Sequence, residues 1–208
     1  MDALPDVLRR RLAGALPGRD AQLRMSPQPR MWPAPDVQLR PAAALLLLYS
    51  AGREWRVPLT VRGAMLRHHG GQVSLPGGRL DRPDESIEAA ALREAHEELG
   101  ILPGDVEVLG RLTPLPIAVS GHLLSPVVGV TAHRPAFVLA APEVERLIEV
   151  PLTWLLDSRT IGREQRPRPR SPHEVMEVPY FEVDGARIWG ATAMILAEFM
   201  EVVGDFEL

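Results

Sequence analysis

One segment of the sequence, residues 86–99, constrains the fold most, because its pattern predicts a helix with one apolar and one acidic face. Four apolar residues recur along it at intervals of four: Ile87, Ala91, Ala95 and Leu99. Gly100 follows directly, as is typical of the residue that ends a helix. The apolar stripe has to be buried, which requires a second layer of structure.

Three carboxylates near the C-terminal end of this helix form what we call the acid cluster: Glu94, Glu97 and Glu98. Residues three and four apart are neighbours on a helix, and like charges at that spacing repel. The end of a helix also favours cations over anions. The cluster therefore costs stability unless a positive charge lies among its members. Hard oxygen ligands of this kind select Mg²⁺ or Mn²⁺, although a solvated acidic face is the alternative interpretation of the three residues alone.

A glycine turn, made of Pro76, Gly77 and Gly78, precedes the helix. Glycines let the backbone approach a ligand closely and leave a carbonyl exposed. We therefore expect a backbone oxygen of this turn to join the acid cluster around a divalent ion. The combination of turn and acids favours a metal site over a solvated face.

The composition limits the kinds of site and partner. The sequence has no cysteine, which excludes disulfides, thiolate ligands and cysteine nucleophiles. The formal net charge of -4 argues against nucleic acid or an anionic membrane as a partner and leaves a small molecule. The longest apolar run, residues 42–49, is too short to span a bilayer, and no signal peptide is visible. We expect a cytoplasmic protein.

The rest of the sequence predicts strands with helices interleaved, which is typical of an α/β or α+β fold with a mixed sheet. We expect residues 1–37 to form a helix and a proline-rich wrapping segment, and residues 38–208 to form the catalytic domain. The expected strands are residues 42–50, 54–61, 106–115, 127–133, 175–181 and 186–189, the first two forming a hairpin. Residues 191–203 are expected to form a closing helix, and residues 62–76 and 163–172 to form loops.

Residues 75–101 resemble the Nudix box, whose pattern is G-x5-E-x7-R-E-U-x-E-E-x-G-U, with U a bulky aliphatic residue. The residues that match in register are Glu85, Arg93, Glu94, Glu97, Glu98, Gly100 and Ile101. The sequence departs from the pattern twice. Six residues, not five, separate Gly78 from Glu85, and Ala95 stands where a bulkier aliphatic residue is usual.

The segment before the box is similar to the extra motif of the coenzyme A pyrophosphatase branch, LLTxR(S/A)x3Rx3GxxxFPGG. The residues that match ahead of the glycine turn are Leu59, Thr60, Arg62, Arg67 and Gly71. Gly63 stands in place of Ser or Ala, and Leu75 in place of Phe. One residue inserted after the double glycine is also typical of that branch.

The resemblance implies an α/β/α sandwich around a mixed sheet, with the box as a loop-helix-loop motif. It implies that the acid cluster holds Mg²⁺ or Mn²⁺ with the Gly78 carbonyl nearby. The implied reaction is hydrolysis of the diphosphate of coenzyme A, or of its acyl derivatives, to 3′,5′-ADP and 4′-phosphopantetheine.

The resemblance also implies roles for individual residues. Arg93 would pair with Glu85 and so orient the helix. Glu97 is our first choice of general base, ahead of three other residues: Glu143, Glu164 and Glu174. The residues expected to contact the substrate are Arg62, Arg67, Gly71 and Gln72.

Several alternatives stay open on the sequence alone. The chain could be a Nudix enzyme for ADP-ribose, NADH or a nucleoside triphosphate, or a non-catalytic nucleotide-sensing module. Trp189 either stacks on adenine or packs in the core, and the arginines of residues 163–170 either clamp phosphate or are solvated. The N-terminal helix either supports a homodimer or covers the site.

Overall fold

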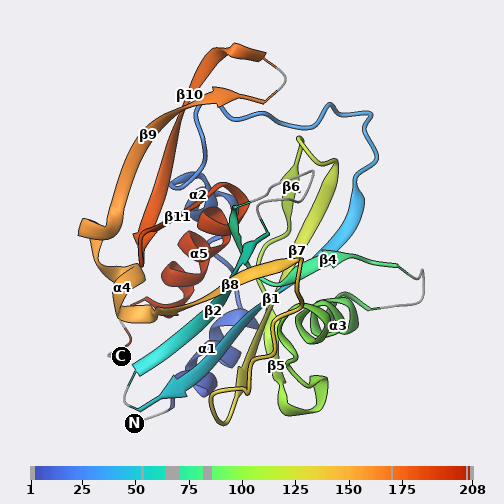
Figure 1. The fold of residues 1–208 in the computed structure, drawn as a ribbon, viewed down its shortest axis with the longest axis vertical. Coiled ribbons are helices and arrows are strands. Elements are labelled where there is room, and N and C mark those ends of the chain that lie inside the picture. The colour runs from blue at the N-terminus through green and yellow to red at the C-terminus, as the bar shows by residue number, and fades with distance from the viewer. Residues whose placement is uncertain are drawn as a thin grey trace.

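The computed structural model describes residues 3–52, 54–63, 71–81, 86–169, 171–204 and 206. A mixed sheet lies between helices on its two sides, with a long hairpin rising beyond the sheet (Figure 1). Helix α3 (Ile87–Leu99) packs on one face of the sheet, and α1 (Leu4–Leu12) and α5 (Gly190–Val203) belong to the core on the other. The predicted α/β class with a mixed sheet is confirmed.

The central strand β1 (Arg40–Ala51) is buried on both faces. Ala43, Leu45 and Leu47 pack in the cluster beneath α3, while Leu46 and Leu48 pack in the cluster beneath α5. A strand covered on both sides has no reason to alternate polar and apolar residues, which explains the continuous apolar run. β1 forms the predicted hairpin with β2 (Glu54–Arg62) and pairs in parallel with β7 (His122–Thr131).

The large sheet has the order β3-β2-β1-β7-β5, with three further strands paired to its members. β4 pairs with β1, β6 with β7, and β8 with β2. The bounds of these smaller strands are β3 Val73–Ser74, β4 Gly77–Arg79, β5 Glu107–Arg111, β6 Leu115–Ile117 and β8 Val144–Pro151. Short helical segments complete the chain: α2 Gly18–Leu23, η1 Pro103–Asp105, α4 Leu152–Leu156 and η2 Ser158–Thr160.

Two expectations about this sheet were wrong in detail. Residues 62–76 are not all loop, because Val73 and Ser74 form β3 opposite Val61 and Thr60. Residues 106–115 are not one strand, because β5 ends at Arg111 and β6 begins at Leu115. Pro114 lies in this break, and proline has no N–H with which to continue a ladder.

The expectation of a loop at residues 163–172 was also wrong. β9 (Ile161–Arg168) pairs with β10 (Ser171–Val183), which pairs with β11 (Ala186–Trp189) through a turn at Asp184 and Gly185. The arginines of β9 are balanced by carboxylates along the hairpin: Arg163 by Glu177, Arg166 by Glu164, and Arg168 by Glu174. Pro167 is tolerated because β9 is an edge strand.

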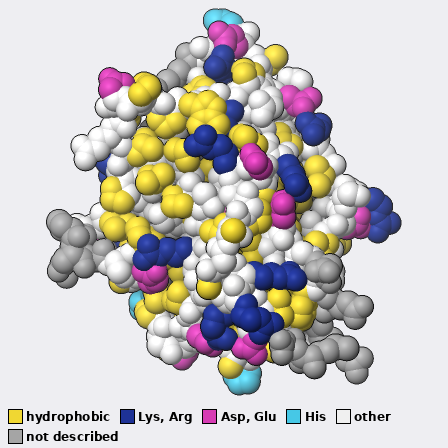
Figure 2. Space-filling view, turned by 180° about the vertical axis from the view of Figure 1, so that it is seen from behind, with side chains coloured by type: hydrophobic (Ala, Val, Ile, Leu, Met, Phe, Trp, Pro, Cys, Tyr) yellow, Lys and Arg dark blue, Asp and Glu magenta, His cyan; other side chains and the backbone are white. Residues whose placement is uncertain are grey.

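The N-terminal segment packs on the core through α1 and α2. Leu4, Leu8 and Leu12 of α1 are buried in the cluster that includes α5. Further along, Gln28 exchanges backbone hydrogen bonds of 2.8 and 2.9 Å with Glu177 of β10. No helix in the described part of the chain is long and apolar enough to cross a membrane. Arginine side chains lie beside acidic ones over much of the face seen in Figure 2.

A buried carboxylate fastens α2 to α5. Glu198 is 0% exposed and accepts hydrogen bonds from the Gly18 N–H (3.2 Å), the Gln22 side-chain amide (2.8 Å) and the Thr113 N–H (3.1 Å). Three separate parts of the chain therefore depend on one side chain. Such a carboxylate stabilises the fold only while all its donors stay in place.

Glu198→Ala should lower the free energy of unfolding by about 3 kcal/mol, because it leaves buried donors unpaired. Denaturant unfolding measures the change. Glu201→Ala is the matched control on the same helix, since Glu201 makes only an exposed ion pair with Arg24; its expected cost is below about 0.5 kcal/mol. Equal costs for the two variants would contradict this role for Glu198.

Candidate functional site

Helix α3 forms as the sequence predicts and carries the acid cluster at its C-terminal end. Ser86 caps its start by accepting a hydrogen bond from the Ala89 N–H at 3.0 Å, and Gly100 ends it in the left-handed conformation at φ 71°. Three small residues make the contact with the sheet, and all are fully buried: Ala90, Ala91 and Ala95. Ala95 departs from the Nudix pattern, and its short side chain is one of the three alanines through which α3 contacts the sheet.

Glu98 is the most buried member of the acid cluster, at 3% exposure. Its Oε1 accepts a hydrogen bond from the Gly77 N–H at 3.3 Å, and its Oε2 accepts one from Thr60 Oγ1 at 3.4 Å. Burial raises the pKa of Glu98 to about 7, against the opposing effect of the Gly77 N–H. A buried carboxylate next to neutral donors favours any arrangement that brings a cation to it.

The glycine turn fits closely between β1 and α3. A Cβ on Gly77 would lie 2.7 Å from the Cα of Ala44, and a Cβ on Gly78 would overlap the carboxylate of Glu94. Gly77 therefore requires glycine for a packing reason, because it meets backbone, whereas a side chain at Gly78 would displace the Glu94 carboxylate. The contact also places the Gly78 backbone directly beside Glu94, whose pKa is raised by burial against the opposing effect of Arg93.

Arg93 lies between two members of the acid cluster. Its Nη1 is 2.9 Å from Glu94 Oε1 and 3.0 Å from Glu97 Oε2, and its Nη2 donates to the Arg79 carbonyl at 3.0 Å. Glu97 is the outermost acid, with a side chain that is 58% exposed. The expected partner Glu85 lies outside the described residues. Across the described ranges, no three acidic or histidine side chains already converge as they would around an ion.

The segment before the glycine turn folds onto the same site. The Arg62 N–H donates to the Gln72 carbonyl at 3.0 Å, and the Gly71 N–H donates to the Arg62 carbonyl at 2.8 Å. The positive charge of Arg62 counteracts the raised pKa of Glu98, so Arg62 lies close enough to act on that carboxylate. Arg67 lies outside the described residues.

Sequence reasoning placed Glu143 behind Glu97 as a general base, level with Glu164 and Glu174, yet the structure places it beside Arg62. Arg62 Nη2 is 3.3 Å from Glu143 Oε1, and the charge of Glu143 contributes to the raised pKa of Glu98. The stretch that leads to Glu143 caps α3, because the Val138 N–H donates to the Leu99 carbonyl and the Ala140 N–H to the Glu98 carbonyl. The end of the helix therefore fixes this loop.

Gly63 has no side chain, which allows the stretch that leads to Glu143 to lie close to β2. Its N–H donates to the Glu143 carbonyl at 2.9 Å, and a Cβ at this position would overlap the carbonyl oxygen of Pro142. The Ser or Ala usual in the coenzyme A branch would not fit here. The departure from that motif was thus the signal in the sequence that another backbone segment approaches this point.

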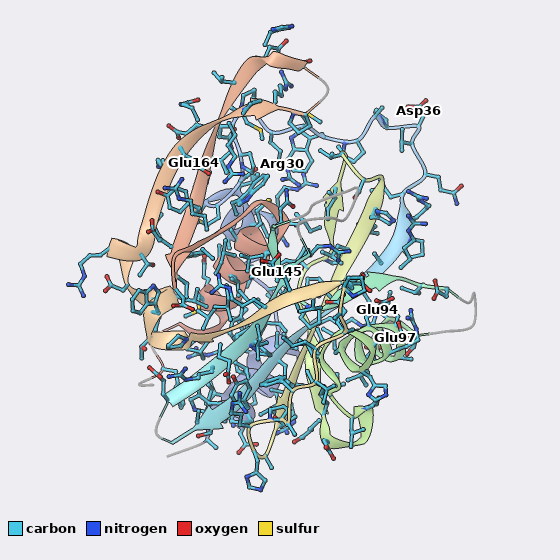
Figure 3. All side chains as sticks on the ribbon, in the orientation of Figure 1. Arg30, Asp36, Glu94, Glu97, Glu145 and Glu164 are labelled. Carbon is cyan, nitrogen blue, oxygen red and sulfur yellow. The ribbon has the colours of Figure 1, made fainter. Side chains whose placement is uncertain are left out.

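The other two candidates for the general base do not reach the acid cluster. Glu164 accepts hydrogen bonds from Arg166 and Arg187, and Glu174 pairs with Arg168 at 2.6 Å. Figure 3 shows Glu164 on β9, well separated from Glu94 and Glu97 on α3. Both residues belong to the hairpin and not to this site.

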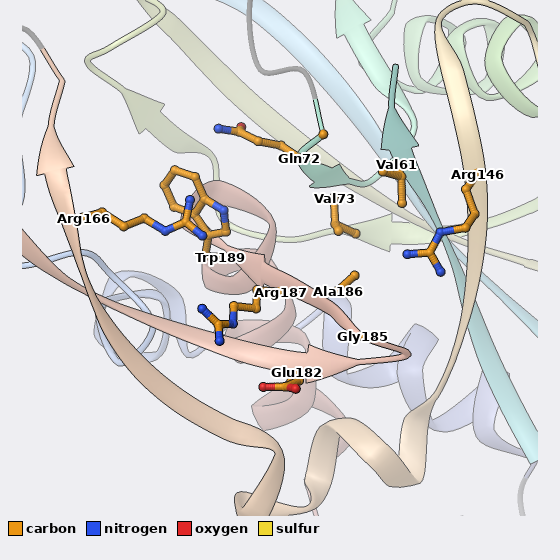
Figure 4. Close-up of a pocket in the computed structure, with 11 residues that line it drawn as sticks. Val61, Gln72, Val73, Arg146, Arg166, Glu182, Gly185, Ala186, Arg187 and Trp189 are labelled. Atoms are coloured by element: carbon orange, nitrogen blue, oxygen red, sulfur yellow. The ribbon is translucent and has the colours of Figure 1, made fainter. Parts of the chain in front are cut away.

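A cavity of about 530 Å³ opens beside the same segment, on the side of the β10–β11 hairpin (Figure 4). Its volume lies in the range of small-molecule sites. Gly71 and Gln72 line it, as do residues from four strands, β8, β9, β10 and β11: Arg146, Arg166, Glu182, Arg187 and Trp189. Trp189 neither packs wholly in the core nor stands free, because the guanidinium of Arg166 lies 4.3 Å from its ring centroid.

The structure combines a mixed sheet, a helix that carries an acid cluster, and a glycine turn before that helix. This combination defines a class of nucleotide hydrolases. The NUDIX domain profile matches residues 38–198, which is more than half of the chain, and the protein belongs to the Nudix family and is a Nudix hydrolase. It is 40% identical over 147 residues to an uncharacterized Nudix hydrolase, NudL, of Pectobacterium atrosepticum, covering 71% of this chain and 74% of that one. The NudL of Photorhabdus laumondii is 37% identical over 161 residues, covering 77% and 84%.

One solved structure has the same fold over most of its length. The Nudix hydrolase RenU from M. smegmatis superposes with a TM-score of 0.52 at 22% sequence identity, covering 88% of this chain and 96% of that one. Identity this low shows the shared fold alone.

Gly63→Ala should lower the free energy of unfolding by about 2 kcal/mol, because the added methyl group meets a backbone oxygen that no rotamer change can move. Denaturant unfolding is again the measurement. Gly104→Ala is the control, since a Cβ there meets no atom within 4 Å. If Gly63→Ala were as stable as Gly104→Ala, the close approach of residues 142 and 143 to β2 would be wrong.

Proposed function

We propose that this Nudix hydrolase cleaves the diphosphate of coenzyme A, or of its acyl derivatives, to 3′,5′-ADP and 4′-phosphopantetheine. The observation that carries the proposal is the contact between the coenzyme A-type motif and the acid cluster. Thr60 Oγ1 lies 3.4 Å from Glu98 Oε2, and Arg62 acts on the same carboxylate. The residues that distinguish the branch thus belong to the site that would carry the chemistry.

The donor set fits a divalent metal ion. Its members are carboxylate oxygens with a backbone carbonyl beside them, which are the ligands that Mg²⁺ and Mn²⁺ prefer. Within the described part of the chain, Glu98 accepts hydrogen bonds from the neutral groups of Thr60 and Gly77, so its negative charge is poorly matched. We therefore propose the acid cluster and the Gly78 carbonyl as the metal ligands. A bound ion would neutralise the diphosphate and lower the pKa of a bound water.

The chain's own residues would then orient and deprotonate the attacking water. Its oxygen forms a bond to one phosphorus, the bridging P–O bond breaks, and its proton passes to a carboxylate. We propose Glu97 for this role, because its exposed side chain can face incoming solvent and substrate. Glu143 is the second candidate, supported by its position beside Arg62.

The remaining roles are positioning and substrate contact. Arg93 contacts Glu94 and Glu97 and would hold the acid cluster in register, with Glu85 as its further partner. Arg62 and Arg67 would contact the diphosphate, since arginine binds phosphate oxygens in a fork. Gly71 and Gln72 would lie along the substrate.

Incubation with coenzyme A and Mg²⁺ or Mn²⁺ should release 3′,5′-ADP, measured by chromatography. Glu97→Gln and Glu98→Gln should each lower kcat by about 100-fold or more, because each removes a charged oxygen from the site. A larger loss for Glu97→Gln than for Glu143→Gln is expected if Glu97 is the base. Glu88→Gln is the matched control on the same helix, since Glu88 pairs with Arg111 away from the cluster.

Each negative result would overturn a different part of the proposed function. Faster hydrolysis of ADP-ribose, NADH or a nucleoside triphosphate than of coenzyme A would overturn the substrate and leave the family unchanged. Full activity of both Glu97→Gln and Glu98→Gln would overturn the site. No metal-dependent hydrolysis of any of these compounds would favour a nucleotide-sensing module.

A further inference from the structure

We infer that the cavity in Figure 4 binds a phosphomonoester carried by the substrate at a distance from the cleaved diphosphate, through Arg166 and Arg187. In coenzyme A this group is the 3′-phosphate of the nucleotide. The inference deepens the proposed function and rests on it for the identity of the substrate. By this inference, the sheet formed by β9, β10 and β11 recognises a second anionic group of the substrate.

The cavity and the acid cluster lie on opposite faces of one strand pair. Thr60 pairs with Ser74 and Val61 with Val73 across β2 and β3. Thr60 contacts Glu98, whereas Val61 and Val73 line the cavity, as expected for neighbours that alternate across a strand. Val73 is four residues from Gly77, so their separation is at most about 14 Å. One substrate molecule can reach both places.

Gly71 gives the substrate a path between the two faces. It lines the cavity at the end of the β2–β3 pair, and a Cβ placed on it would meet no atom within 4 Å. The space around it is therefore open. Arg62, whose carbonyl accepts the Gly71 N–H, acts on Glu98 on the other face. We therefore assign Arg62 to the diphosphate. A further phosphate group on the substrate needs positively charged residues outside the acid cluster's side of the sheet.

Arg166 and Arg187 supply that charge. They donate to different oxygens of the same carboxylate, Glu164, so two cations share one anion there, while Glu182 adds a second negative charge that acts on Arg187. A guanidinium has five N–H donors, and Glu164 takes one from each. Aromatic rings hold both groups: Arg166 lies 4.3 Å from the Trp189 centroid, and Arg187 lies 4.7 Å from the Tyr180 centroid.

The lining suits one small anion better than a polyanion. Figure 4 shows Arg166 and Arg187 on the Trp189 side of the cavity and Arg146 across from them. Arg146 is already paired with Asp184 at 3.1 Å, and Glu182 contributes a negative charge to the lining. A single phosphate between Arg166 and Arg187 brings fewer negative charges near that carboxylate than a polyanion would. Bidentate contacts from two guanidiniums are the strongest recognition that this site can offer to phosphate.

The test compares two nucleotides that differ only in the 3′-phosphate. Calorimetry in the presence of Mg²⁺ should show that the protein binds 3′,5′-ADP at least about 10-fold more tightly than 5′-AMP, because charge-assisted hydrogen bonds are lost without that group. Arg166→Gln and Arg187→Gln should each remove most of this preference and leave the affinity for 5′-AMP unchanged.

Arg163→Gln is the matched control. Arg163 belongs to the same strand but lies three residues from Arg166, so it points to the other face; it pairs with Glu177 and its side chain is 59% exposed. This variant should keep the full preference. An absent preference in the unaltered protein, or a preference retained in both Arg166→Gln and Arg187→Gln, would overturn the inference. Inorganic phosphate that competes as well as 3′,5′-ADP would overturn it too, since the site would then bind any phosphate.

An error in the role proposed for the cavity and an error in the proposed substrate would give different results. Equal kcat/KM values for coenzyme A and its 3′-dephospho form would overturn the role of the cavity while the diphosphate chemistry stands. Tight, Arg166-dependent binding of 3′,5′-ADP without cleavage of coenzyme A would support the cavity and point to another 3′-phosphorylated nucleotide as substrate.

Discussion

The environment of Glu98 is the constraint on which the rest of the site depends, because three segments of the chain meet at this carboxylate. A carboxylate that is 3% exposed and hydrogen-bonded by the neutral groups of Gly77 and Thr60 has a raised pKa, because burial disfavours its charged form. Three segments converge to create this environment: α3 carries the acid, β2 supplies the hydroxyl, and the glycine turn supplies the N–H. The arrangement gains stability when a cation is added. We regard this as the physical reason for the metal site that we propose here.

Glycines set the distances around that carboxylate. Gly77 lets the turn lie on β1, Gly78 makes room for Glu94, and Gly63 lets the loop before Glu143 close on β2. Gly77 and Gly63 meet backbone atoms, so a side chain at either position would push apart two segments that share the site, whereas one at Gly78 would displace the Glu94 carboxylate. Small alanines on the buried face of α3 serve the same end by bringing the helix down onto the sheet. The site is therefore shaped by residues that have no chemistry of their own.

Features encoded locally were predictable from the sequence, and features created by distant contacts were not. The helix, its cap and the acid cluster follow from spacing within 14 residues, and the hairpin of β1 and β2 follows from two apolar runs around a turn. Glu143 could not be placed, because its position depends on Gly63 some 80 residues earlier and on the end of α3. β9 was mistaken for a loop because two of its arginines, Arg163 and Arg168, are neutralised by carboxylates of β10. The cavity escaped prediction because six strands from separate parts of the chain supply its walls.

The most direct measurement is a crystal structure of the protein with Mn²⁺, with the ion located by its anomalous scattering. The expected result is a peak within about 2.2 Å of carboxylate oxygens of the acid cluster, with the Gly78 carbonyl beside it. A well-ordered structure at saturating Mn²⁺, in which Glu98 keeps only its contacts to Gly77 and Thr60 and no ion lies near Glu94, would contradict the metal site and with it the proposed chemistry.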